Sequence, residues 1–156
     1  MRALSATLAL LLIALPGSSQ TFAAVAIDSK GRVQATTTDG RHVQVSWHRP
    51  CEDPAISSDR KTVAWIELQT VNVDRGRYHE RGVIRWTRGR ARHSVLAGAL
   101  GIRDFWFVDG GKKLGVYLGP SHGPGMNQLF DVESGVTIDE YLDISKEPAP
   151  AWLDGG

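Results

Sequence analysis

The segment with the most potential metal ligands is His48-Arg-Pro-Cys51-Glu52-Asp53. It brings an imidazole, a thiol and two carboxylates into six residues, and zinc and copper accept these ligand types. Closed metal sites need about four ligands at fixed spacing, and no second cluster such as Cys-x-x-Cys completes this one. A small metal-binding protein or metal-dependent enzyme that uses His48, Cys51 and Glu52 is therefore the less favoured of two interpretations of this segment. A buried thiol in a proline-rich loop, with no metal or cofactor, is preferred.

A second candidate is the glycine-rich loop from Gly119 to Gly125, which contains Ser121 and His122. Glycines let a backbone approach a ligand closely, and loops at the ends of sheets commonly carry binding residues. A serine adjacent to a histidine in sequence is not a catalytic pair. Gly119-Pro-Ser121-His-Gly123 has the G-x-S-x-G spacing, but it lies between two expected strands and so is not the strand-to-helix elbow of that motif. The chain has no H-E-x-x-H or phosphate-cradling motif. The loop predicts ligand or partner binding, or else a plain turn, and no catalytic residue is assigned.

The basic loop from Asp74 to Arg81 is expected to accompany the Gly119–Gly125 loop. If two repeated units pack with like ends together, His122 would lie beside Arg75, Arg77 and His79. Such a site would suit an anion.

Charge is distributed unevenly along the chain. Seven arginines lie between Arg75 and Arg92 against the single acid Glu80, whereas seven acids follow from Asp131 onward against the single Lys146. The two patches could hold parts of the chain together, pair neighbouring molecules or simply face solvent. Arginines interleaved with aromatic residues can also bind nucleic acid, but an exported protein seldom meets it. An envelope protein or an anionic envelope component is the expected partner.

The first residues read as a signal peptide, residues 1–24, with an apolar run from Leu8 to Leu15. The run is shorter than the roughly 20 residues of a membrane-spanning helix, so the chain is not expected to span the membrane. Small residues place cleavage between residues 23 and 26, and Ala24-Val25-Ala26 fits best. We expect a periplasmic or secreted protein, with a retained anchor as the alternative. Cys51 is the only cysteine, so no internal disulfide can form.

Residues 32–47 predict a β-hairpin that turns at Asp39-Gly40. Alternation places one set of side chains on the apolar faces: Val33, Ala35, Thr37, Val43, Val45 and Trp47. The intervening side chains are expected to face water or a partner: Arg41, His42, Gln44 and Ser46.

The remaining strands are separated by proline, glycine and polar breaks. Residues 48–54 predict a loop because two prolines lie four residues apart. Strands are expected at 55–56, 62–71, 83–87 and 91–96, with Val63, Trp65 and Ile66 turned inward and a polar loop over 73–82. The stretch 104–142 contains four further strands. Residues 146–156 predict a loose tail that Trp152 could anchor.

Two parts of the chain repeat. With an offset of 51 residues, Ala55–Asp59 matches Trp106–Gly110 and Thr62–Trp65 matches Lys113–Val116. With an offset of 46, Arg85–Gly89 matches Asp131–Gly135, so the first copy has a middle loop five residues longer. A period near 45 to 50 with four strands a unit is typical of a propeller blade.

PAISSDRKTVAW and FWFVDGGKKLGVY resemble the turn-and-strand core of TolB-like and other WD-type propeller blades, and LFDVESG resembles the next strand and turn. The whole chain also resembles a group of small exported proteobacterial proteins of unknown function. The likeness covers residues 54–142; it implies architecture and supplies no catalytic residue. Two blades cannot close a propeller, which takes four to eight. Either the two units pack face to face in one chain or several chains assemble, and the monomer is preferred. We therefore expect an all-β domain, residues 25–145, with two four-stranded blade-like antiparallel sheets, residues 54–97 and 103–142, and an N-terminal hairpin. The expected function is that of an exported, non-catalytic binding or accessory module.

Overall fold

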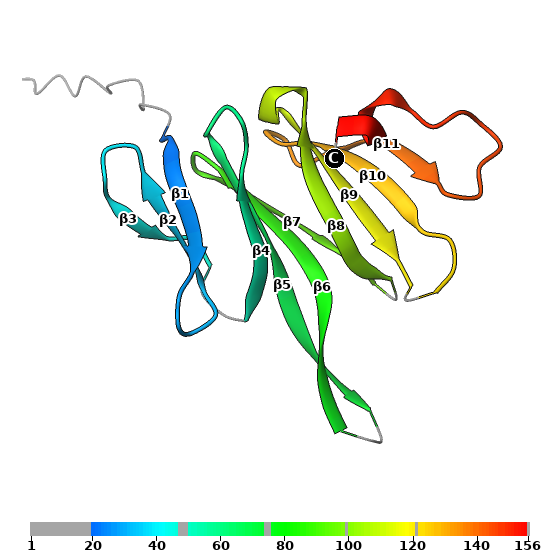
Figure 1. The fold of residues 1–156 in the computed structure, drawn as a ribbon, viewed down its shortest axis with the longest axis horizontal. Coiled ribbons are helices and arrows are strands. Elements are labelled where there is room, and N and C mark those ends of the chain that lie inside the picture. Colours follow the sequence, from blue (N-terminus) through cyan, green and yellow to red (C-terminus); the bar gives the residue numbers. More distant parts are fainter. Residues whose placement is uncertain (1–19, 47–49, 74–75, 99, 121, 156) are drawn as a thin grey trace, which may run out of the picture.

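Three antiparallel sheets follow one another along the chain in the computed structural model (Figure 1). It describes residues 20–46, 50–73, 76–98, 100–120 and 122–155, with the backbone alone for residues 71–73 and 76–78. The N-terminal sheet has the order β1-β2-β3, the middle sheet β4-β5-β6-β7 and the last sheet β11-β10-β9-β8. The chain is all-β and no sheet closes on itself, so the predicted fold class is confirmed.

The strands are β1 (Phe22–Ile27), β2 (Val33–Thr37), β3 (His42–Gln44), β4 (Cys51–Ile56), β5 (Thr62–Val73), β6 (Gly76–Arg88), β7 (Ala91–Leu96), β8 (Gly101–Val108), β9 (Lys113–Gly119), β10 (Met126–Asp131) and β11 (Thr137–Leu142). Two short 3₁₀ helices complete the described elements, at Asp109–Gly111 and Ala151–Gly155. No helix within the described residues is both long and apolar enough to cross a membrane.

The middle sheet is buried on both faces. Along β5, Val63 and Trp65 pack in a cluster shared with the N-terminal sheet, while Ala64 and Ile66 pack in a larger cluster shared with the last sheet. Successive side chains of a strand point to opposite faces, so a strand buried on both sides carries an almost unbroken apolar run. The segment Thr62–Leu68 has this pattern, and the predicted inward positions of Val63, Trp65 and Ile66 are confirmed.

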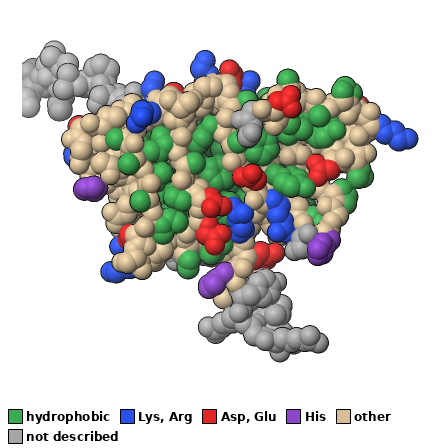
Figure 2. All heavy atoms as spheres, viewed as in Figure 1, with side chains coloured by type: hydrophobic (Ala, Val, Ile, Leu, Met, Phe, Trp, Pro, Cys, Tyr) green, Lys and Arg blue, Asp and Glu red, His purple; other side chains and the backbone are tan. Residues whose placement is uncertain are grey.

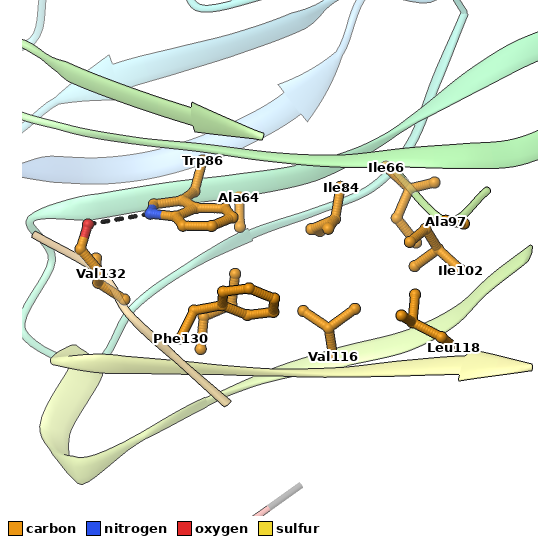
Figure 3. Close-up of a cluster of buried hydrophobic side chains, with 11 residues drawn as sticks. Ala64, Ile66, Ile84, Trp86, Ala97, Ile102, Val116, Leu118, Phe130 and Val132 are labelled. Carbon is orange, nitrogen blue, oxygen red and sulfur yellow. Dashed lines mark hydrogen bonds between the residues drawn. The ribbon is translucent and has the colours of Figure 1, made fainter. Parts of the chain in front are cut away.

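The larger cluster joins the two four-stranded sheets. Figure 3 shows Trp86 and Ile84 of β6 facing Phe130 and Val116 of the last sheet. The indole Nε1 of Trp86 donates a hydrogen bond of 3.0 Å to the carbonyl oxygen of Val132. An indole N–H needs an acceptor when it is buried, so this bond also fixes how the two sheets are aligned.

The N-terminal hairpin forms as predicted, with Val33 and Ala35 fully buried and the turn glycine Gly40 at φ +85°. Two features were not predicted. β1 adds a third strand to the hairpin, within the segment assigned to the cleavage region. Ser46 is buried instead of facing water or a partner, because the backbone N–H groups of Val45 and Ser46 both donate to the carbonyl of Val33. This irregularity turns Ser46 inward, where its Oγ accepts a bond of 2.7 Å from the Val33 N–H.

Two predicted loops are partly strands. β4 begins at Cys51, inside the predicted proline-rich loop, and accommodates Pro54 through a bulge between Glu52 and Ala55. Proline is tolerated there because β4 is an edge strand. The predicted polar loop over 73–82 is mostly the continuation of β5 and β6, which pair out to Val73 and Gly76. This extended hairpin projects from the rest of the molecule (Figure 1).

The repeat in the sequence reappears as matching turns. Gly89 and Gly135, which are 46 residues apart, both adopt positive φ, +58° and +72°. At the first turn of each unit, Arg60 has φ +59° where its counterpart Gly111 has φ +87°. Left-handed backbone is less favourable for arginine than for glycine, so the first copy departs from the pattern at a structural cost.

Arg88 links the two four-stranded units. Its Nη1 donates to Asp59 at 2.8 Å and its Nε donates to Glu133 at 3.0 Å. Burial acts to raise the pKa of the Asp59 carboxyl, but hydrogen bonds from Ser57, Lys61 and Arg88 together hold this pKa below its usual range. Arg88–Glu133 is therefore one ion pair through which the basic and acidic parts of the chain meet.

The last segment packs on the outer face of the last sheet. The rings of Trp106 and Trp152 stack with centroids 6.2 Å apart, and Trp106 Nε1 donates to the carbonyl of Trp152 at 3.2 Å. Trp152 Nε1 in turn donates to Asp139 at 2.8 Å. The predicted tail, residues 146–156, thus contains a 3₁₀ helix placed over Trp106 through Trp152.

Candidate functional site

Only part of the predicted loop site lies within the described residues. Ser121 and Arg75 are outside them, and of Arg77 only the backbone is described. His122 is exposed in the connection between β9 and β10. His79 is exposed on β6, with its Nδ1 3.5 Å from Thr70 Oγ1. Within the described set no hydrogen bond joins His79 to His122, so the shared anion site stays a prediction.

The two regions that carry these residues are nevertheless linked by arginine side chains that donate to backbone carbonyls. Arg81 Nη1 donates to the carbonyl of Arg103 at 2.7 Å, and Arg103 Nε donates to the carbonyl of Gly119 at 2.8 Å. Arg81 also forms an ion pair with Asp53 and lies 3.7 Å from Glu52. Figure 2 shows acidic and basic side chains grouped above the projecting hairpin on this face. Arg81 is therefore engaged within the chain.

The predicted metal ligands do not converge where the structure describes them. Cys51 points into the cluster beneath the N-terminal sheet, and its Sγ donates to Ser46 Oγ at 3.4 Å. Glu52 is exposed on the other side of β4 and faces Arg81. His48 lies outside the described residues, and no three His, Cys, Asp or Glu side chains gather within them. Burial raises the pKa of the Cys51 thiol, which keeps it protonated.

A cavity that the sequence did not indicate lies between the end of β3 and the middle sheet. Its volume is about 260 Å³. Residues from four successive parts of the chain line it: Val45, Ser46, Trp65, Glu67, Arg85, Trp86, Arg92, His93 and Ser94. We call it the Trp65 cavity. It is of the order of small-molecule sites, which occupy roughly 300–1,000 Å³.

Trp65 contributes the most informative group. The side chain is 3% exposed, and its Nε1 is buried with no hydrogen-bond partner among the described residues. Buried polar groups in folded proteins are nearly always paired, and an unpaired one costs about 1–3 kcal/mol. Trp86 illustrates the rule, since its indole N–H is paired with Val132. Trp65 thus lines the cavity and carries a buried indole N–H that has no partner among the described residues.

The charges of the cavity are arranged with a positive excess. Glu67 is 5% exposed and forms an ion pair with Arg85, which neutralises it. Arg92 also lines the cavity, and no ion pair to it is found within the described part of the chain. Arg92 and Val45 are shared with a second cavity of about 260 Å³, which Arg90 lines as well. The second cavity thus neighbours the Trp65 cavity at Val45 and Arg92, and Arg90 and Arg92, which have no ion pair within the described residues, give this region an environment that favours an anion.

Part of this arrangement was visible in the sequence. The inward position of Trp65 was predicted, and Glu67 stands out as an acid inside the buried run of β5. The inward position of Ser46 could not be predicted from the sequence. It depends on the Val33 carbonyl, which accepts hydrogen bonds from the backbone N–H groups of both Val45 and Ser46.

Comparison of the chain with protein-family models, with curated proteins and with solved structures finds no match.

Proposed function

We propose that the protein is an exported, non-catalytic binding module of the cell envelope that holds an anionic ligand in the Trp65 cavity. The observation that carries the proposal is that Trp65, whose buried indole N–H has no partner among the described residues, lines a cavity together with Arg92. A carboxylate or phosphate oxygen accepts from an indole N–H and pairs with a guanidinium, so one anionic group could engage both Trp65 and Arg92.

The polar groups of the cavity suit binding better than chemistry. Glu67, the only carboxylate among the described residues that line the cavity, is held by Arg85. A general base must reach the proton that it removes, and an engaged carboxylate is poorly placed for that task. The signal-like N-terminal sequence supports a location in the periplasm or outside the cell.

The test follows the indole resonance of Trp65 in ¹⁵N-labelled protein, assigned by its loss in Trp65→Phe. Citrate and inorganic phosphate are the probes, and native mass spectrometry of protein released by osmotic shock looks for a co-purified acid. We expect a downfield shift of the Trp65 indole proton with a probe or with the co-purified acid. Arg92→Ala should abolish the shift, while Arg41→Ala, an exposed arginine on the turn of the N-terminal hairpin, should leave it unchanged.

The proposal fails if no acid co-purifies and neither probe moves the Trp65 resonance. It also fails if the response is the same in Arg92→Ala as in the wild type. Export is tested separately by fractionating cells that express the full chain, and recovery only from the cytoplasm would contradict that part.

A further inference from the structure

β7 is a terminal strand of the middle sheet, and one of its edges is free. The sheet has the order β4-β5-β6-β7, so among the described strands β7 pairs with β6 alone. The two strands are paired without a bulge from the turn at Arg88 and Ala91 to Val83 and Leu96. No backbone hydrogen bond within the described residues reaches the other edge of β7. Such an edge is a template on which another chain can pair.

The pairing pattern shows which backbone groups of β7 point outward. The N–H of Ala97 donates to the carbonyl of Gly82 at 2.9 Å, one position beyond the last residue pair of the two strands. In antiparallel strands, pairs that exchange hydrogen bonds alternate with pairs that do not. The backbone groups of every second residue, counted back from Ala97, therefore point to β6. Those of Arg92, Ser94 and Leu96 point to the free edge.

The side chains of the same three residues share one face. Arg92, Ser94 and Leu96 are exposed, Leu96 by 70%. Successive side chains of a regular strand alternate between its faces. The intervening Val95 packs against the core between the two four-stranded sheets. The three exposed side chains therefore lie on the opposite face, where Arg92 and Ser94 line the Trp65 cavity. We call these three residues the β7 edge.

Charge and apolar surface indicate what a strand added to the β7 edge would carry. Arg92 has no ion pair within the described residues, and neither has Arg90 at the turn before β7. Directly opposite residues of an antiparallel pair share a face, and opposite charges stabilise the pair. A glutamate opposite Arg92 would form a cross-strand ion pair, and a valine opposite Leu96 would cover its exposed side chain. Because the strands run in opposite directions, the apolar residue comes first and the acid follows four positions later.

We propose that the β7 edge is the docking site for an extended acidic segment of a partner protein. This segment adds an antiparallel strand to the middle sheet, with an apolar residue opposite Leu96 and an acid opposite Arg92. In strand addition, backbone hydrogen bonds give affinity and alternate side chains give specificity. The β7 edge shares Arg92 with the Trp65 cavity, but strand addition does not use the Trp65 indole.

The sequence of β7 distinguishes this occupant from a second copy of the chain. Two copies of an edge strand can pair about a two-fold axis. β7 is Ala-Arg-His-Ser-Val-Leu and contains no acidic residue. Antiparallel pairing of two β7 strands would thus leave Arg92 without a carboxylate in every alignment.

The test is a titration of the ¹⁵N-labelled protein with acetyl-Thr-Val-Thr-Thr-Thr-Glu-Thr-amide, whose only charge is the glutamate. We expect saturable downfield shifts of the amide protons of Arg92, Ser94 and Leu96, because these groups gain acceptors. In the bound peptide, the nitrogens of the glutamate and of the middle threonine between valine and glutamate face β7, so methylating both should abolish binding. Methylating the two threonines on either side of that middle one should preserve it, because their nitrogens face away.

A charge exchange tests the acid. Glutamine in place of the glutamate should weaken binding about threefold or more, and Arg92→Glu should instead prefer a peptide with lysine at that position. Leu96→Ser should weaken binding by a similar factor. Leu142→Ser, which changes an exposed leucine on β11, should bind as the wild type does.

Unmoved edge amides at millimolar peptide, equal binding of the glutamate and glutamine peptides, or full binding of the peptide methylated on the side facing β7 would each overturn the proposal. So would a wild-type dimer in sedimentation velocity that Leu96→Glu converts to monomer, since the occupant would then be a second copy. If citrate or phosphate moves the Trp65 indole resonance while the peptide moves no edge amide, the docking proposal alone fails. If the peptide binds as described while no acid moves the indole, the anion site alone fails.

Discussion

If the predicted signal peptide is removed, Phe22 limits where cleavage can occur. Its side chain is 3% exposed and packs in the cluster beneath the N-terminal sheet. Its backbone N–H donates to the carbonyl of Arg60 at 2.8 Å, and the carbonyl of Thr21 accepts from Thr38 at 3.0 Å. Cleavage between residues 23 and 26 would divide β1 and remove these contacts. We therefore predict that the mature chain begins at or before Thr21.

The expected cost of the later cut follows from these contacts. Truncating a buried phenylalanine to alanine typically costs about 3–5 kcal/mol, and each lost hydrogen bond contributes about 1 kcal/mol more. Small domains have a free energy of unfolding of only about 5–15 kcal/mol. A chain that starts at Val25 should thus lose a large part of its stability relative to one that starts at Gln20.

Urea unfolding of the two purified chains measures this difference. With a slope of about 2 kcal/mol per molar urea, a loss of about 4 kcal/mol lowers the midpoint by roughly 2 M. Phe22→Ala in the longer chain should reproduce most of the shift, while Ala23→Ser, at an exposed neighbour, should not. Equal midpoints for the two chains, or a mature N-terminus at residues 24–27 by mass spectrometry, would refute the reasoning.

Three further substitutions test the packing of the sheets. Gly115→Ala would place a methyl group 2.4 Å from the Trp106 ring. We expect the free energy of unfolding to fall by about 1–3 kcal/mol and the near-UV circular dichroism signal to weaken. An unchanged spectrum would contradict the contact. Gly135→Ala should lower the free energy of unfolding in chemical denaturation more than Gly89→Ala. Both glycines have positive φ, but only a Cβ at residue 135 would meet another side chain, 2.3 Å from His93 Nδ1. Equal losses would be evidence against that packing. Because the pKa of Asp59 is lowered in the folded state, its carboxylate stabilises the protein above pH of about 4, and this contribution is lost as the pH falls further. Asp59→Asn should therefore flatten the dependence of the free energy of unfolding on pH between about pH 5 and pH 2. The same pH dependence in the variant and the wild type would rule this out.

The sequence was most informative where side-chain alternation and turn residues agree. The hairpin at Gly40 and the buried run around Trp65 could be predicted, because positive φ and burial on both faces impose recognisable residue types. β1 was missed because Ala-rich segments satisfy the rules for leader cleavage and for an edge strand equally well. The extension of β5 and β6 was missed because its polar residues resemble those of a loop, and backbone pairing alone carries the strands outward.

The Trp65 cavity was hidden for a different reason. It forms where the N-terminal sheet meets β7, and this meeting depends on packing between segments that are far apart in the sequence. The predicted site at His122 rests on the assumption that like ends of the two units lie together. The hydrogen bonds from Arg81 through Arg103 to Gly119 are consistent with that assumption, but they do not place a ligand there.

The arginine-rich run shows why charge along a sequence is an incomplete guide to a binding surface. Arg81, Arg85 and Arg88 look equivalent to their neighbours in the sequence, yet each is engaged with a carboxylate of the same chain. Arg90 and Arg92 have no such ion pair within the described residues; Arg92 lines the Trp65 cavity, and both line the second cavity. A count of arginines therefore overstates the basic surface. The charge that can attract an anion lies at the turn between β6 and β7 and at the start of β7, where Arg92 lines the same cavity as Trp65.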